Sequence, residues 1–176
     1  MQHDVGDVVR NFFAFTNPAG ALTNPTTVTL KYKPPSSAVV SKVYGTDAEA
    51  KRAETQLNGA LSDSATTITV DATTGFPAAD AVFPITDETA ALRLIYIDSE
   101  TLRVTGGFGT LVWTVERGVG GTTAAAHLDN APVIGPYYID VTVTNDPGTW
   151  QTRGVGTGAV HQSVPLSFGV LASELV

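Results

Sequence analysis

The side chains of this sequence that could carry chemistry are few and scattered. Asp98 and Glu100 are separated by one residue, and paired carboxylates can transfer protons or bind a cation. The chain also has three histidines, His3, His127 and His161, but none stands in a His-x-x-x-His or Glu-x-x-His spacing. We therefore expect a solvated turn for the two carboxylates, surface or satisfied polar positions for the histidines, and no bound metal.

Motifs for nucleophilic catalysis and for phosphate binding are also missing from the sequence. Ser99 and Ser163 lack the Gly-x-Ser-x-Gly context of a nucleophile elbow. The Gly-Val-Gly-Gly stretch at 118–121 lacks the Lys-Ser/Thr that completes a phosphate-binding loop, so it is interpreted as a tight turn. The chain has no cysteine, which excludes disulfides and thiolate metal sites. The sequence thus predicts a protein that is not an enzyme and holds no cofactor.

Some of these residues could instead contact a partner protein. Tyr137 and Tyr138 are neighbours on one expected strand, so they point to opposite faces and one of them should be exposed. Phe108 lies in a glycine-rich turn, and aromatic residues are favoured at interfaces. The candidate partner contacts are Tyr138, Phe108, Asp98 and Glu100.

The elements that must position these side chains are short strands. Val and Thr, which recur throughout, suit a pleated and half-buried surface, while 17 Gly and 10 Pro supply turns. Residues 26–33 alternate between apolar and polar, with Val28, Leu30 and Tyr32 on one face. Other strand candidates are found at 8–15, 39–44, 66–70, 92–97, 101–105, 111–117, 137–144, from Trp150, and at 164–170. This spacing is typical of an all-β sandwich or barrel.

Between these runs, local signals predict turns and short helical segments. Gly154–Gly158 is expected to turn, and Thr122–His127 is expected to form a single helical turn with a threonine cap. Asp47–Gln56 has good helix propensity when considered alone. Trp113 and Trp150 each lie on an expected strand, and we expect both of them in hydrophobic cores.

Composition and charge exclude several classes of function. The chain of 176 residues is 43% hydrophobic and 15% charged, which is typical of a folded protein. Its net charge of −7 disfavours non-specific binding to nucleic acid. The N-terminus lacks the basic and apolar regions of a signal peptide, and no stretch approaches the ~18 apolar residues needed to span a bilayer. We expect neither nucleic acid nor a membrane as partner.

Charge also divides the chain into a middle and two flanks. Residues 57–136 contain three basic and nine acidic residues, a net −6, whereas the remaining 96 residues carry only −1. Such a shift with two boundaries predicts an insertion within a host domain. Residues 1–56 and 137–176 together approach the ~100 residues of an immunoglobulin-like β-sandwich. Residues 57–136 would then form a second small β domain, inserted at a hairpin tip.

The two flanks carry sequence patterns that resemble a known family. The stretches concerned are Asp4–Val9, Asn24–Leu30, Tyr44–Glu49, Tyr137–Thr142, Pro147–Trp150 and Gly154–Ala159. They resemble small immunoglobulin-like proteins of tailed bacteriophages, often encoded among head and head–tail connector genes. In that family a short turn joins the two halves, and residues 57–136 depart from this pattern. The resemblance implies that Asp47–Gln56 is a strand.

The middle of the chain resembles a second phage sequence pattern. Ala65–Val70, Gly75–Pro77 and above all Thr114–His127 look like a small β module that recurs in phage virion proteins. Together the resemblances imply a virion structural protein, assembled in the host cytoplasm. It would be an accessory component of the head or head–tail connector, present in several symmetric copies, and would bind other virion proteins of the capsid, connector or tail through strand edges and loops.

Two other interpretations remain open at this point. The protein could belong to the tail or baseplate, with residues 57–136 binding a receptor or glycan through an exposed aromatic platform such as Tyr138 and Phe108 beside Asp98. A hydrolase that uses Asp98 and Glu100 is the weaker alternative.

Overall fold

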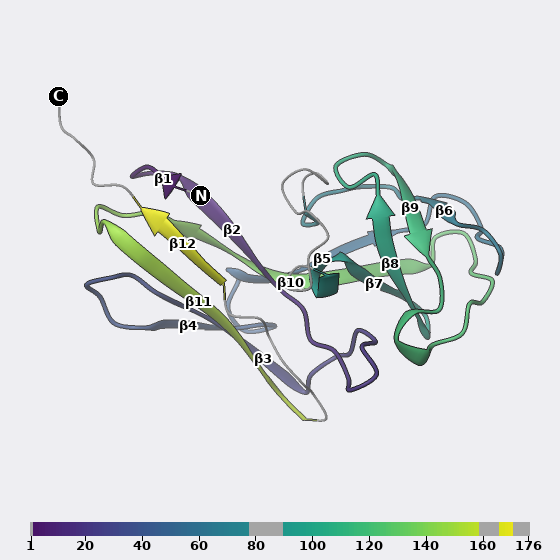
Figure 1. Ribbon diagram of the computed structural model, residues 1–176, viewed down its shortest axis with the longest axis horizontal. Helices are drawn as coiled ribbons and strands as arrows, with labels where there is room; N and C mark the ends of the chain where they lie inside the picture. Colours follow the sequence, from purple (N-terminus) through teal and green to yellow (C-terminus); the bar gives the residue numbers. More distant parts are fainter. Residues whose placement is uncertain (1, 78–89, 159–165, 171–176) are drawn as a thin grey trace.

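The computed structural model describes residues 2–77, 90–158 and 166–170, and in these residues the chain is almost entirely β (Figure 1). His161, Ser163 and Val164, which the sequence analysis singled out, lie outside the described residues. None of the helices in the described part is long and apolar enough to cross a membrane.

The first sheet has five strands and lies on the left of Figure 1. In spatial order these are β1 (Gln2–His3), β12 (Leu166–Val170), β11 (Gly148–Thr157), β3 (Thr27–Lys33) and β4 (Val40–Val43). The pairs are antiparallel except for β1 and β12. Val28 and Leu30 are buried and Tyr32 is half-buried, which confirms the alternation expected for 26–33.

The second sheet has seven strands and extends across the molecule (Figure 1). Its order is β2 (Val8–Phe13), β10 (Pro132–Thr142), β7 (Leu94–Ile97), β8 (Glu100–Gly106), β9 (Val112–Glu116) and β6 (Thr67–Thr69), with β5 (Ala50–Gln56) also paired to β10. Two 3₁₀ turns, η1 (Ala90–Arg93) and η2 (Val119–Gly121), complete the fold of the described residues.

Strands β5 and β10 connect two lobes of the molecule. In β10, Tyr137 pairs with Phe13 of β2 and with Arg52 of β5. Three and four residues further back towards the start of the strand, at Ile134 and Val133, β10 has exchanged β2 for β7 but keeps β5 as its other neighbour. A bulge between Ile134 and Tyr137 marks the change. The two lobes therefore share a continuous β-ribbon, which is stiffer than a pair of loops (Figure 1).

The first lobe, here called the sandwich lobe, packs the five-stranded sheet against β2, β5 and the second half of β10. Its core consists of Val9, Phe13, Phe15, Val28, Leu30, Ala50, Tyr137, Ile139, Val141, Val143 and Trp150. Trp150 is 1% exposed, and its indole N–H donates to the Asp146 carbonyl at 3.0 Å. The expectation of a core position for Trp150 is confirmed.

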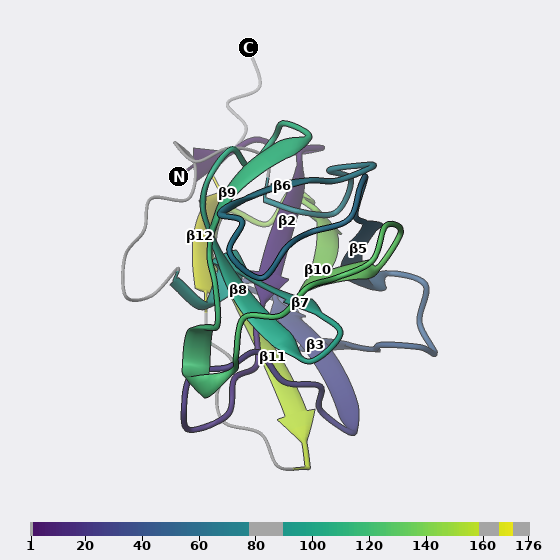
Figure 2. The ribbon, with the colours of Figure 1, turned by 90° about the vertical axis from the view of Figure 1, so that its right-hand side faces the viewer.

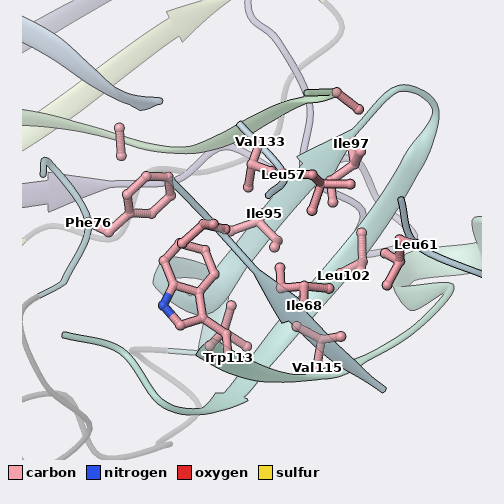
Figure 3. Close-up of a cluster of buried hydrophobic side chains, with 14 of the residues drawn as sticks. Leu57, Leu61, Ile68, Phe76, Ile95, Ile97, Leu102, Trp113, Val115 and Val133 are labelled. Carbon is pink, nitrogen blue, oxygen red and sulfur yellow. The ribbon is translucent and has the colours of Figure 1, made fainter. Parts of the chain in front are cut away.

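The second lobe, here called the middle lobe, contains β6, β7, β8, β9 and the first part of β10, and its sheet closes on itself (Figure 2). After β5 ends, Leu57 forms a bridge to Val70, and the Asp71 N–H donates to the Gln56 carbonyl at 3.0 Å. The closed sheet surrounds the side chains shown in Figure 3. They include Leu57, Ile68, Ile95, Ile97, Leu102, Val115 and Val133 around Trp113, which is fully buried as expected.

A third apolar cluster fills the junction between the lobes. It consists of Phe12, Ala14, Leu22, Leu92, Leu94, Val119 and Tyr138. At its rim, η2 of the middle lobe lies against the β2–β3 connection of the sandwich lobe. A Cβ atom on Gly120 would be 2.2 Å from the Ala21 backbone nitrogen, so only glycine fits there. The Gly-Val-Gly-Gly stretch is therefore a contact between lobes as well as a turn.

The structure decides three of the sequence-based expectations about secondary structure. In Asp47–Gln56 the strand implied by the resemblance forms only from Ala50 onwards, where Ala50 and Ala53 pack into two cores beside β10, and residues 47–49 form a turn. The expected helical turn at Thr122–His127 is wrong: the 3₁₀ turn is η2, and Thr122 is its extended C-terminal cap. The expected turn at Gly154–Gly158 is also wrong, because β11 continues to Thr157 and pairs with β3.

Candidate functional site

Glu100 is the centre of the most elaborate polar cluster among the described residues. It begins β8 directly after the two-residue turn Asp98–Ser99, in which Asp98 has a left-handed φ of 52°. Its pairing with Ile97 directs the carboxylate into the middle lobe, where Glu100 is 0% exposed. The expectation of a solvated position for both carboxylates is wrong for Glu100.

Arg117 supplies the opposite charge. Its Nε donates to Glu100 Oε1 at 2.8 Å and its Nη2 donates to Oε2 at 2.7 Å, so the two planar groups meet at two points. The remaining donors of the guanidinium reach three backbone carbonyls, those of Ser62, Ala65 and Ala125, at 2.6–2.9 Å. One side chain thus joins β8 to two loops that carry no regular structure.

Two backbone N–H groups and one histidine complete the surroundings of the carboxylate. Gly118 N–H donates to Oε1 at 3.0 Å and Ala125 N–H donates to Oε2 at 3.1 Å. His127 lies with Nε2 2.9 Å from Glu100 Oε2 and Nδ1 2.7 Å from Asp98 Oδ2. A neutral imidazole has one N–H and can donate to only one of these oxygens, whereas a protonated ring donates to both.

The electrostatic balance at Glu100 favours the carboxylate form. Burial opposes the negative charge, but the hydrogen bonds from Arg117, His127 and the two backbone N–H groups outweigh it and lower the pKa of Glu100 to about 2. A carboxylate held ionised in this way is a poor general acid or base at neutral pH. Its lone pairs are directed at donors from the same chain. The cluster is therefore suited to fastening loops together.

A metal ion is a poor fit to the same cluster. Arg117 and two backbone N–H groups occupy the carboxylate oxygens that a cation would need. In the part of the chain that the structure describes, no group of three His, Cys, Asp or Glu side chains could hold a metal ion.

The other candidate contact residues are placed differently from expectation. Phe108 is 4% exposed and packs edge-to-face on Trp113 in the middle-lobe core. Tyr138 is 7% exposed in the junction between the lobes, where Arg10 lies 4.4 Å from its ring centre, and Tyr137 is buried as well. The expectation that one of the two tyrosines is exposed is thus wrong. Among the four candidates only the Asp98 side chain, 57% exposed, lies at the surface.

Sequence reasoning missed Arg117 and His127 as the partners of Glu100. Their separations of 17 and 27 residues correspond to no local motif, and closing the sheet is what brings them together. The usable signal was the unusual stretch Thr114–His127, which contains Arg117, Gly118, Ala125 and His127, all four of which contact Glu100.

The surface offers a different kind of site along β5. An open depression of about 460 Å³ is lined by Tyr44, Gly45, Thr46, Asp47, Ala48, Ala50, Lys51, Arg52 and Glu54. Tyr44 packs edge-to-face on Tyr137, and Arg52 lies 4.6 Å from the Tyr137 ring centre, so one wall is held in place by the sandwich core. The depression lies along β5 and contains charged groups of both signs, Lys51 and Arg52 beside Asp47 and Glu54.

No protein-family model matches this chain. No curated protein matches its sequence either.

Proposed function

We propose that this chain is an accessory structural protein of a tailed-bacteriophage particle, which acts by binding neighbouring virion proteins of the head or head–tail connector and catalyses no reaction. The sequence resemblances described above are one support. The observation that carries the proposal is the division of roles between the two sites. The buried charges hold loops together, while the side of β5 that faces away from β10 pairs with no other strand in the described part of the chain.

In this proposal the sandwich lobe is an immunoglobulin-like domain formed by residues 1–56 and 137–176, and residues 57–136 are a module inserted at a hairpin tip. The separate apolar cores of the two lobes support this division. So does the position of the boundaries, because β5 ends at Gln56 and the bulge in β10 lies between Ile134 and Tyr137. Such an insertion adds surface without disturbing the host sandwich.

The shared ribbon gives the proposal a mechanical basis. Tyr138 and Phe12 fill the junction beside β10, and Arg10 covers Tyr138 while binding Asp140 at 2.6 and 2.9 Å. A partner bound to one lobe would therefore be held at a defined position relative to the other lobe. This suits a component that must repeat its contacts around a symmetric particle.

The test is to locate the chain in purified particles by cryo-electron microscopy. We expect density for both lobes in symmetric copies at the head surface or the neck, with a neighbouring protein at the β5 depression or the loops. Density at the tail tip would instead favour the receptor-binding interpretation, although its proposed aromatic platform, Tyr138 and Phe108, is buried. Absence of the chain from the particle would reject a virion role.

A further inference from the structure

The outer face of the five-stranded sheet, here called the basic face, carries three basic side chains. Lys31 and Lys33 of β3 and Arg153 of β11 point away from the sandwich core, because the alternate residues Leu30 and Thr152 are buried. In the part of the chain that the structure describes, no carboxylate forms an ion pair with any of the three. Arg153 is directly opposite Lys31, and like charges in such a position destabilise a sheet. The basic face therefore has an electrostatic cost that the described residues do not offset.

An apolar row lies beside these charges on the same face. Thr29 of β3 is opposite Val43 of β4 on one side and opposite Val155 of β11 on the other, so the three side chains form a row across the sheet. All three are half-buried. The next row along the strands contains Lys31 and Arg153. The basic face thus presents apolar surface directly next to positive charge.

The far end of the middle lobe carries complementary groups. Leu128, in the loop before β10, is 81% exposed, more than any other large apolar side chain of the described residues. Asp129 follows it directly, and Asp98 lies at the same end because Ile97 pairs with Val133 near the start of β10. This end, here called the acidic tip, lies away from the five-stranded sheet (Figure 1).

Three carboxylates of the acidic tip are accessible to a partner. Asp63 is exposed and lies two residues after Leu61, which forms a bridge to His127. Asp129 accepts from a backbone N–H through Oδ1, and Asp98 contacts His127 through Oδ2, so each keeps one carboxylate oxygen for another donor. The acidic tip therefore combines an exposed leucine with negative charge, as the basic face combines apolar surface with positive charge.

We propose that the acidic tip of one copy docks on the basic face of a second copy, with Leu128 against the valine row and the carboxylates against Lys31 and Arg153. The charge distribution favours this occupant, because residues 57–136 carry a net charge of −6 and the remaining residues only −1. The total charge of −7 disfavours a nucleic acid on the same face. The contact does not depend on the virion role proposed above.

Docking of this kind joins two different surfaces, so each copy keeps one basic face or one acidic tip for a further copy. The contact therefore propagates, and it forms a ring if the rotation between copies closes and an open chain if it does not. The unaltered chain should associate past the dimer as its concentration rises. Because the contact is electrostatic in part, raising the ionic strength from about 0.05 M to about 0.5 M should weaken it.

Sedimentation velocity of the full chain tests the contact by charge reversal. Arg153→Glu on the basic face and Asp63→Lys on the acidic tip should each raise the dissociation constant roughly tenfold or more, because like charges then meet. Leu128→Ser should also weaken association, since it removes the apolar contact without a change of charge. Thermal melts of each variant separate loss of docking from loss of folding.

Mixing the two charge variants tests whether the two surfaces meet each other. Each variant alone should remain monomeric at concentrations at which the unaltered chain associates. An equimolar mixture of Arg153→Glu and Asp63→Lys should associate again, because the unaltered tip of the first variant meets the unaltered face of the second. A mixture that stays monomeric, while the unaltered chain associates, would contradict docking of tip on face.

Asp71→Lys is the matched control for Asp63→Lys. It makes the same change of charge at an exposed residue outside the acidic tip, where the Asp71 N–H binds the Gln56 carbonyl, and it should leave association unchanged. Equal effects of the two substitutions would overturn the proposal, because net charge alone would then explain them. So would an unaltered chain that stays monomeric up to roughly 1 mM. A monomer that immobilised heparin retains through Arg153 would assign the basic face to an anionic polymer instead.

Discussion

Arg117 meets Glu100 through two parallel hydrogen bonds of 2.7 and 2.8 Å, at a position where the Glu100 residue is fully buried. The pair is formed between the start of β8 and the residue that follows β9. Because Arg117 also binds the carbonyls of Ser62, Ala65 and Ala125, it holds two loops against the strands. The ion pair thus links two loops of the middle lobe to its strands.

Replacement of Glu100 by glutamine should destabilise the protein strongly. The amide keeps the size of the side chain but leaves the buried guanidinium without its counter-charge, and breaking such a pair typically costs about 3–5 kcal/mol. Urea denaturation of Glu100→Gln measures the loss. The control is Glu116→Gln, which breaks the exposed 2.8 Å pair with Arg103 and should cost less than about 1 kcal/mol. Equal losses would show that the buried pair has no special role.

The pH dependence of stability should contain the signature of Glu100. Its ordinary pKa of 4.5 applies in the unfolded chain, and folding lowers the pKa to about 2. The carboxylate therefore stabilises the fold fully above pH 4.5, and this contribution, of the order of 3 kcal/mol, disappears as the pH falls towards 2. The difference in free energy of unfolding between the unaltered chain and Glu100→Gln should shrink over this interval. A difference that is constant from pH 5 to pH 2 would contradict the assigned pKa.

His127 should matter more than the exposed carboxylate it contacts. Its side chain is 1% exposed between Glu100 and Asp98, so His127→Ala removes a buried ring and one donor to Glu100, at a cost of about 2–4 kcal/mol. Asp98→Asn keeps a residue that tolerates the left-handed backbone and removes only an exposed charge, which should cost less than about 1 kcal/mol. Thermal melts of the two variants rank them, and the reverse order would show that the surface contact dominates.

The sequence carries most of the strand pattern because burial on one face imposes a period of two. Thr27–Lys33 shows this clearly, with Val28 and Leu30 facing the core. The same period failed to place Tyr138. Its face of β10 would be solvated in a single sandwich, but here the middle lobe covers it through Leu94 and Val119. A contact between lobes of this kind does not appear in the apolar–polar alternation of either segment that makes it.

The candidate site was harder to anticipate than the strands. A carboxylate beside a turn, as in Asp98-Ser99-Glu100, is normally solvated, and only the three-dimensional closure of the sheet brings Arg117 and His127 to Glu100. Gly154 and Gly156 led to the wrong expectation of a turn for a related reason. Glycine predicts a turn locally, yet a Cβ on Gly156 would be 3.0 Å from the Phe15 ring, so its role is to admit that ring beside β11.

The contact between the lobes gives a last prediction, which separates backbone strain from steric fit. Gly120 and Gly121 both have positive φ, 67° and 81°, so alanine is strained at either position. Only at Gly120 would the new Cβ collide with Ala21, at 2.2 Å, whereas at Gly121 its nearest neighbour is the Ala19 side chain at 4.0 Å. Gly121→Ala should cost about 1 kcal/mol, and Gly120→Ala should cost distinctly more, because η2 must withdraw from the sandwich lobe.

Residual dipolar couplings of the two variants complete this comparison. In Gly121→Ala the two lobes should keep a common alignment tensor, as expected for lobes joined by β5, β10 and an intact junction. In Gly120→Ala the contact between Gly120 and Ala21 is lost, which should loosen the junction around Val119. The alignment tensors of the two lobes should then diverge. Equal stability and equal alignment in both variants would show that the ribbon alone fixes the lobes and that the glycine contact is incidental.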